Sequence, residues 1–263
     1  MNVKFLIAAC VTVLSLTSTF AEPTNIAEDD ASPYGSSWDN AKNAGSGFGN
    51  WTQTTEGNAD KRHSGFFIAT TENNKDLNGI AKDNKAFGLF ANGTGFEQAV
   101  AYRSFAKPLV IGDSFSFMME SGAFEKKFET DDPTPSSVGL VLRTGNANTA
   151  TSDYNTNAVC EIGHYQGKNN YQIYDGTENT DSGVAFTDAG ISATVTVTGP
   201  DTYDLEIQNM ADKAITKLPG RKLKASGAIE SMAVFNRNSE KNDVFFNQFQ
   251  VTRETATPSV DIR

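Results

Sequence analysis

Cysteine and histidine are both scarce in this sequence. Its 263 residues include two cysteines, Cys10 and Cys160, and two histidines, His63 and His164, which lie far apart. A disulfide-stapled fold or a structural zinc site requires clusters of these residues, so both are excluded. We expect Cys10 to be removed with a signal peptide, which leaves Cys160 without an internal partner. The fold must therefore be stabilised by a hydrophobic core, and we interpret Cys160 as a small buried apolar residue.

Long hydrophobic runs are also missing beyond the N-terminus. Lys4 precedes an apolar run at residues 5–16, and small polar residues lead to Ala21. The run is shorter than the roughly 20 residues that span a bilayer as a helix, and the layout is typical of a secretory signal peptide covering residues 1–21. We expect a secreted protein, extracellular or periplasmic, without membrane insertion and from a bacterial source.

Basic residues are outnumbered, with 22 Lys and Arg against 32 Asp and Glu and a formal net charge of −10. An acidic chain is repelled by phosphate backbones, which argues against nucleic acid as a partner. The same composition is compatible with Ca²⁺, which prefers carboxylate and carbonyl oxygens.

No segment shows a 3.6-residue apolar repeat with helix caps. Short strand-like runs alternate instead with turn residues. The clearest pair is residues 192–197 and 203–207, in which apolar and polar side chains alternate around the turn Gly199-Pro200-Asp201. Many short strands without helices predict an all-β protein, a two-sheet antiparallel β-sandwich. We expect a flexible leader at residues 22–37, one sandwich domain at 38–253 and a C-terminal tail at 254–263.

The last strand-like run covers residues 244–251. Strict alternation along it predicts that the even-numbered residues from Val244 to Gln248 share one face of the sheet. The odd-numbered residues from Phe245 to Val251 would share the other.

The second half of the chain resembles the concanavalin A-like or laminin-G-like jelly roll. The resemblance rests on residues 137–143, 171–176 and 245–251, together with the hairpin above. It implies a secreted sandwich of the kind found in lectins, carbohydrate-binding modules and polysaccharide-degrading enzymes. In the first half, residues 45–51 and 85–92 are similar to uncharacterised secreted proteins of environmental bacteria.

Motifs for hydrolytic catalysis are absent. There is no Gly-x-Ser-x-Gly elbow, and the strand with three alternating acids that glucanases of this fold carry has no counterpart. A lyase remains the alternative. His164 and Tyr165 could serve as base and acid, and Arg143 could neutralise a uronate carboxylate.

Sugar binding without catalysis needs aromatic rings that stack on pyranose faces and amides that bind hydroxyl groups. Tyr165, Tyr171 and Tyr174 flank polar loops, and Asn170 lies among them, so we predict these four as ligand contacts. Trp38, Trp51 and Tyr154 are weaker candidates because large aromatic residues also fill sandwich cores.

A structural calcium ion is a further expectation, and the available acidic loops offer Asp131, Asp132 and Asp175 as ligands. The sequence favours a non-catalytic protein that binds polysaccharide or cell-surface glycan. A polysaccharide lyase and a self-associating structural matrix protein are the alternatives, and the oligomeric state is left open.

Overall fold

The computed structural model describes residues 23–57, 63–93, 95–124, 134–147, 153–239 and 242–254. The predicted signal peptide at 1–21 lies outside this part. No helix long and apolar enough to cross a membrane occurs among the described residues.

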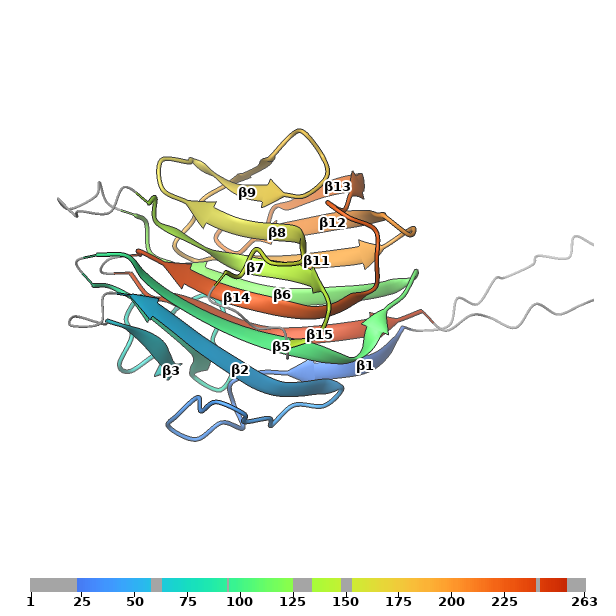
Figure 1. Cartoon of the computed structure of the whole chain (residues 1–263). Helices are drawn as coiled ribbons and strands as arrows, with labels where there is room; N and C mark the ends of the chain where they lie inside the picture. The colour runs from blue at the N-terminus through green and yellow to red at the C-terminus, as the bar shows by residue number, and fades with distance from the viewer. Residues whose placement is uncertain are drawn as a thin grey trace, which may run out of the picture.

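Two antiparallel sheets pack face to face, which confirms the predicted all-β sandwich (Figure 1). Sheet 1 has eight strands in the order β13-β12-β11-β6-β15-β4-β3, with β1 also paired to β15. Sheet 2 has seven strands in the order β10-β9-β8-β7-β14-β5-β2. The strands of sheet 1 are β1 (Thr24–Asp29), β3 (Ser64–Thr70), β4 (Lys85–Ala91), β6 (Asp113–Ser121), β11 (Ile191–Val197), β12 (Thr202–Asn209), β13 (Ile215–Lys222) and β15 (Val244–Arg253). The strands of sheet 2 are β2 (Phe48–Gly57), β5 (Glu97–Leu109), β7 (Ser137–Thr144), β8 (Ala158–Tyr165), β9 (Asn170–Tyr174), β10 (Asp181–Ala185) and β14 (Ile229–Arg237).

Side-chain alternation builds the core between the sheets. In β11 and β12, apolar residues point inward and polar residues outward, because successive side chains of a strand face opposite sides. The hairpin predicted at residues 192–207 is confirmed by the pairing of Val195 with Leu205, both of which are buried.

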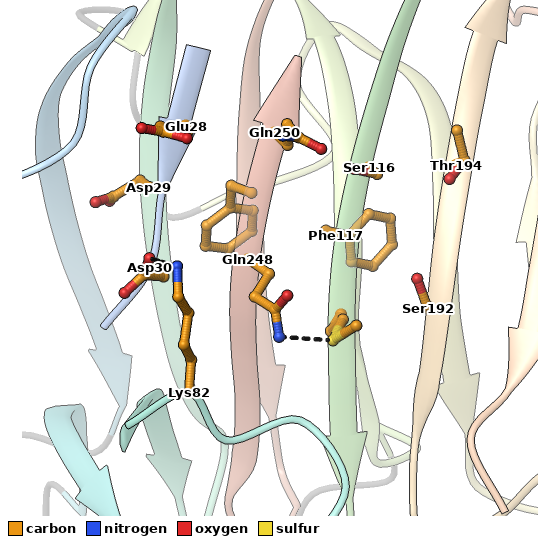
Figure 2. A pocket seen from close by; sticks show the side chains of 12 residues that line it. Glu28, Asp29, Asp30, Lys82, Ser116, Phe117, Ser192, Thr194, Gln248 and Gln250 are labelled. Atoms are coloured by element: carbon orange, nitrogen blue, oxygen red, sulfur yellow. Dashed lines mark hydrogen bonds and ion pairs between the residues drawn. The ribbon is translucent and has the colours of Figure 1, made fainter. Parts of the chain in front are cut away.

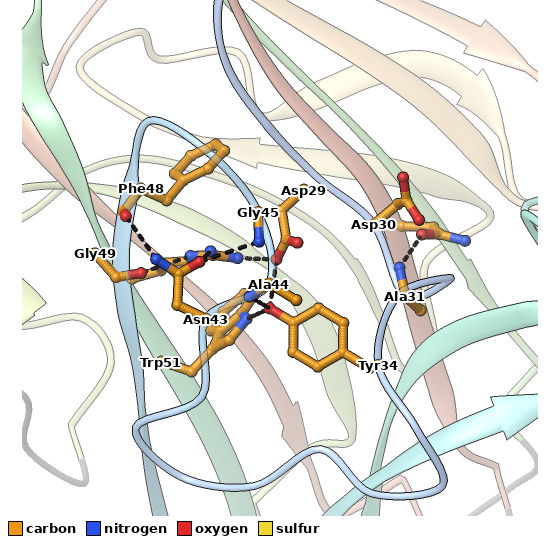
Figure 3. Close-up of polar contacts among 12 residues, drawn as sticks. Asp29, Asp30, Ala31, Tyr34, Asn43, Ala44, Gly45, Phe48, Gly49 and Trp51 are labelled. Carbon is orange, nitrogen blue, oxygen red and sulfur yellow. Dashed lines mark hydrogen bonds and ion pairs between the residues drawn. The ribbon is translucent and has the colours of Figure 1, made fainter.

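The predicted flexible leader is wrong. Residues 24–29 form β1, which pairs with the second half of β15, and the following segment folds back against the core. The Tyr34 hydroxyl donates to Asp29 Oδ2 at 2.9 Å and accepts from Trp51 Nε1 at 3.2 Å (Figure 3). Backbone pairing holds β1 against β15, and a polar sequence such as that of residues 24–29 does not reveal this pairing. The domain therefore begins before residue 38.

A buried ion pair ties β1 to sheet 2. The Arg103 guanidinium, on β5, donates to Asp29 Oδ2 on β1, and both side chains have no exposed surface. Its Nε donates to the Gly49 carbonyl at 3.0 Å, and the group lies over the rings of Phe48 and Trp51, 4.8 Å from each centroid. Burial lowers the pKa of Arg103 to about 9. This contact crosses the core and holds the two sheets together at the N-terminal edge.

The expected alternation along residues 244–251 holds only as far as Asn247. There the pairing of β15 with β6 jumps from Asn247↔Met118 to Gln250↔Ser116, so β15 contains one extra residue. A β-bulge of this kind shifts every later side chain to the other face. Phe249 and Val251 consequently join the core together with Phe246, while Phe245 packs outside sheet 1.

Loops cover part of each outer face. Outside sheet 2, Tyr154 and Ala147 pack on Val141 and Phe235. Outside sheet 1, Leu77 and Ile80 pack on Ala69, Ala86 and Phe245.

Candidate functional site

Glu161, Tyr165 and Tyr174 come together on the outer face of sheet 2, and we call them the tyrosine site. Strands β8 and β9 are neighbours in sheet 2 (Figure 1). Tyr165 and Glu161 lie on β8, and Tyr174 lies on β9, directly opposite Glu161. The Tyr165 hydroxyl donates to Glu161 Oε1. The two tyrosine rings meet edge to face, with centroids 4.9 Å apart and planes at 78°. Both tyrosines are half-buried, so neither residue is closed off from solvent.

Two glycines leave room for this arrangement. Gly139 on β7 pairs with Gly163 on β8, so the backbone beside Tyr165 is bare. A Cβ atom placed on Gly163 would lie 3.3 Å from Tyr165 Cε2, tighter than ordinary contact. The ring can therefore fold back along its own strand and reach the carboxyl group four residues earlier.

Glu161 is 3% exposed, and burial raises its pKa to about 7. Two nearby cations, Lys224 and Arg237, act in the opposite direction and favour the carboxylate. Glu161 thus changes its charge close to neutral pH. It is a donor and acceptor when protonated and only an acceptor when ionised.

The structure places the four predicted contacts differently. Tyr165 and Tyr174 lie together in the tyrosine site. Tyr171 points to the opposite face of β9, where it is 1% exposed and its hydroxyl donates to the Thr187 carbonyl at 3.1 Å. Asn170 is half-buried, and its amide donates to Asp181 at 2.9 Å across the β9–β10 pair. The prediction that Tyr171 presents a ring to a ligand is therefore wrong, because strand alternation turns it into the core.

The lyase trio of His164, Tyr165 and Arg143 is also wrong. His164 points into the sandwich, where its ring stacks on Phe186 at 3.9 Å and on Phe124 at 4.8 Å between centroids. Burial lowers the pKa of His164 to about 4.

Arg143 and Tyr165 point outward, to the face opposite His164. Arg143 has no exposed surface, and it lies over the Tyr102 ring while its Nε donates to the Thr156 carbonyl at 3.1 Å. These residues cannot act on one substrate in this arrangement.

The weaker aromatic candidates are buried, Trp38 and Trp51 between the sheets and Tyr154 outside sheet 2. Trp38 and Trp51 meet edge to face at 4.9 Å, and both contact Phe87. Tyr154 stacks on Phe235 at 3.8 Å. All three candidates are 3% exposed or less, so none is a surface ligand contact.

Asp175 forms part of a polar network rather than an open metal site. Its two carboxylate oxygens accept from Arg221 at 2.8 and 3.0 Å, and one also accepts from the Tyr203 hydroxyl at 2.5 Å. Asp131 and Asp132 lie outside the described residues, so their role in calcium binding stays a prediction. Among the residues that the structure describes, no group of three acidic, histidine or cysteine side chains is arranged to hold a metal ion.

Glu161 was not predicted as a site residue. The signal in the sequence is a single acid in the apolar run Val159-Cys160-Glu161-Ile162, with Gly163 and Tyr165 on the same face at steps of two. Alternation alone identifies that shared face. It does not reveal that the acid is buried while the tyrosines are half-buried.

No family model matches the chain, and no curated protein matches it significantly. Among solved structures, the cellulose-induced protein Cip1 is similar at a TM-score of 0.46 and 11% identity, over 85% of this chain and 95% of that one. The carbohydrate recognition domain of Emp46p gives 0.41 and 10%, over 73% and 89%. The lumenal domain of VIP36 bound to Ca²⁺ and Man2 gives 0.42 and 9%, over 75% and 84%. Scores and identities this low leave the function to be argued from the residues of this chain.

Proposed function

We propose that the protein is a secreted, non-catalytic β-sandwich that binds a polysaccharide or a cell-surface glycan through the tyrosine site. The observation that supports this function is the pair of half-open rings, Tyr165 and Tyr174, beside the buried carboxyl group of Glu161. Secretion is supported by the layout of residues 1–21.

The chemistry of the tyrosine site suits a sugar. An aromatic face packs against the C–H face of a pyranose, and tyrosine adds a hydroxyl that can bind at the edge of the ligand. The perpendicular arrangement of Tyr165 and Tyr174 offers one ring face and one ring edge to the same ligand. The Tyr165–Glu161 hydrogen bond fixes the first ring before binding, which reduces the entropy lost on association.

The proposal of a non-catalytic role is supported by what surrounds the site. Lyase chemistry requires a base and a cation on the same face, and His164 lies on the face opposite Arg143. Retaining glycoside hydrolysis requires two carboxyl groups about 5 Å apart. The second acid whose charge acts on Glu161 is Asp153, and its carboxylate accepts from the Asn155 N–H at 3.0 Å and the Thr156 hydroxyl at 3.3 Å in its own turn.

The test is a glycan array and a pull-down with insoluble polysaccharides, using residues 22–263 with Ca²⁺ and again with EDTA. Tyr174→Ala should abolish capture by the glycan that the wild-type protein binds. Tyr165→Phe separates the ring from the hydroxyl, because it keeps the ring and removes the group that reaches Glu161, so capture should weaken without being lost.

Capture that is unchanged in Tyr174→Ala would rule out the tyrosine site. Failure on every glycan, together with concentration-dependent oligomers in sedimentation, would favour the structural alternative. Binding that is lost in EDTA would point to a calcium requirement.

A further inference from the structure

The β-bulge in β15 places Gln248 in an unusual conformation. Its φ is +52°, in the left-handed region, which glycine adopts freely and other residues adopt at a cost. The bulge lies where the pairing of β15 with β6 shifts by one residue. Bulges and strained residues are over-represented at functional sites, where they re-aim a side chain.

The Gln248 side chain borders a hollow of about 280 Å³ on the outer face of sheet 1 (Figure 2). Hydroxyl side chains from two neighbouring strands form its floor, Ser116 on β6 and Ser192 and Thr194 on β11. Gln250 on β15 adds a second amide. The volume lies just below the range of about 300–1,000 Å³ typical of drug-sized ligand pockets, which suits a single sugar ring.

Within the described part of the chain, the amide of Gln248 is poorly satisfied. Among the described residues, its Nε2 donates to one acceptor, the thioether sulfur of Met118 at 3.2 Å. A thioether is a weak acceptor, whereas an amide offers two donors and a carbonyl oxygen with two lone pairs. A strained backbone thus presents an amide that retains most of its hydrogen-bonding capacity.

The charges at the edge of the hollow limit the ligand. Lys82 and Asp30 neutralise each other in an ion pair at 2.6 Å, and Glu28 adds a negative charge on the same side. An anionic ligand would be repelled, while hydroxyl and amide groups bind neutral hydroxyl groups without a charge penalty. The hollow therefore favours an uncharged, hydroxyl-rich ligand.

We infer that this hollow is a second binding site, which takes one neutral sugar unit through the amide of Gln248 and the hydroxyls of Ser116, Ser192 and Thr194. It lies on sheet 1, whereas the tyrosine site lies on sheet 2, so the inference does not rest on the proposed function. No aromatic ring is exposed in the floor, since Phe117 and Phe249 face the core. Binding through hydrogen bonds alone should be weak, with a dissociation constant on the order of 1 mM.

The test is an NMR titration of the ¹⁵N-labelled protein with methyl α-D-glucopyranoside and methyl α-D-galactopyranoside. Sodium glucuronate serves as the anionic counterpart. We expect the side-chain amide of Gln248 and the backbone amides of Ser116 and Thr194 to shift and saturate with a neutral sugar and to stay unchanged with glucuronate. An absence of shifts at these positions with both neutral sugars would overturn the inference, as would shifts that appear only in β8 and β9.

Gln248→Gly provides the second test, because glycine keeps the left-handed backbone and removes the side chain with its amide. We expect at least a tenfold weaker affinity and no loss of thermal stability. Gln208→Ala is the matched control, since the Gln208 amide lies outside the hollow and donates to the Lys213 carbonyl at 3.3 Å. An unchanged affinity in Gln248→Gly would contradict the inference. Tyr174→Ala should leave this titration unaltered, so a failure of the tyrosine site and a failure of the hollow are seen separately.

Discussion

Replacing Glu161 with glutamine should change how the stability of the protein depends on pH. Burial raises the pKa of Glu161 from 4.5 to about 7. The folded state therefore holds this proton more tightly than the unfolded state, and the stability it contributes is fully present below pH 4.5. That stability is lost as the pH rises through 7, because the unfolded chain releases its proton first.

The size of the effect follows from the shift. A difference of about 2.5 pKa units corresponds to about 3 kcal/mol between the two ends of the range. Glu161→Gln keeps a carbonyl that can accept from Tyr165 and has no proton to lose. The free energy of unfolding of the variant, minus that of the wild-type protein, should therefore rise by about 3 kcal/mol between pH 4.5 and pH 8.

Urea unfolding at a series of pH values, followed by fluorescence, measures this difference. Other buried acids, such as Asp243 with a pKa raised to about 6 by burial and by Asp76, affect both proteins equally and cancel. Tyr165→Phe is a useful companion, because removing the donor to the carboxylate should steepen the loss of stability. A stability difference that stays constant across the pH range would refute the burial of Glu161 as described.

Three further substitutions test the fold. Asp29→Ala leaves the Arg103 guanidinium buried without its carboxylate, so the free energy of unfolding in urea should fall by about 3–5 kcal/mol. A fall of less than about 1 kcal/mol would mean that the ion pair is effectively solvated. Gln248→Gly should leave the stability unchanged or raise it by up to about 1 kcal/mol, because glycine adopts the left-handed backbone of this position without the cost that glutamine carries. A clear loss of stability in thermal unfolding would contradict the strain at Gln248. Arg221→Met removes the partner of the buried Asp175 carboxylate and should lower the free energy of unfolding in urea by about 3 kcal/mol. Arg221→Lys should recover part of this loss. Equal stability of Arg221→Met and the wild-type protein would show that the network is not needed.

The sandwich was predictable because its inner strands follow simple alternation. The run from Ile191 to Ile207 shows its buried and exposed positions directly in the sequence. The N-terminal segment was missed because β1 is joined to β15 mainly through backbone hydrogen bonds, and its buried side chains include Asp29, which looks like a surface residue until Arg103 is placed beside it. The bulge at Gln248 was missed because one inserted residue leaves no mark in composition, yet it reverses the faces of Phe249 and Val251.

The candidate site was predictable only in part. Tyr165 and Tyr174 lie side by side in the structure, and their role as ligand contacts stays a prediction. Alternation along β9 already implied that Tyr171 and Tyr174 face opposite sides. The position of His164 depends on its packing between Phe124 and Phe186, which come from distant parts of the chain. Contacts of that kind are set by the packing of the whole sandwich, and no local pattern encodes them.

The most direct test of carbohydrate binding at the tyrosine site is a calorimetric titration of the best glycan from the array into wild-type protein and Tyr174→Ala. Loss of a central aromatic contact typically costs about 2 kcal/mol or more, so the affinity should fall about 30-fold. An equal affinity in the two proteins would contradict the central claim and place glycan recognition elsewhere on the sandwich.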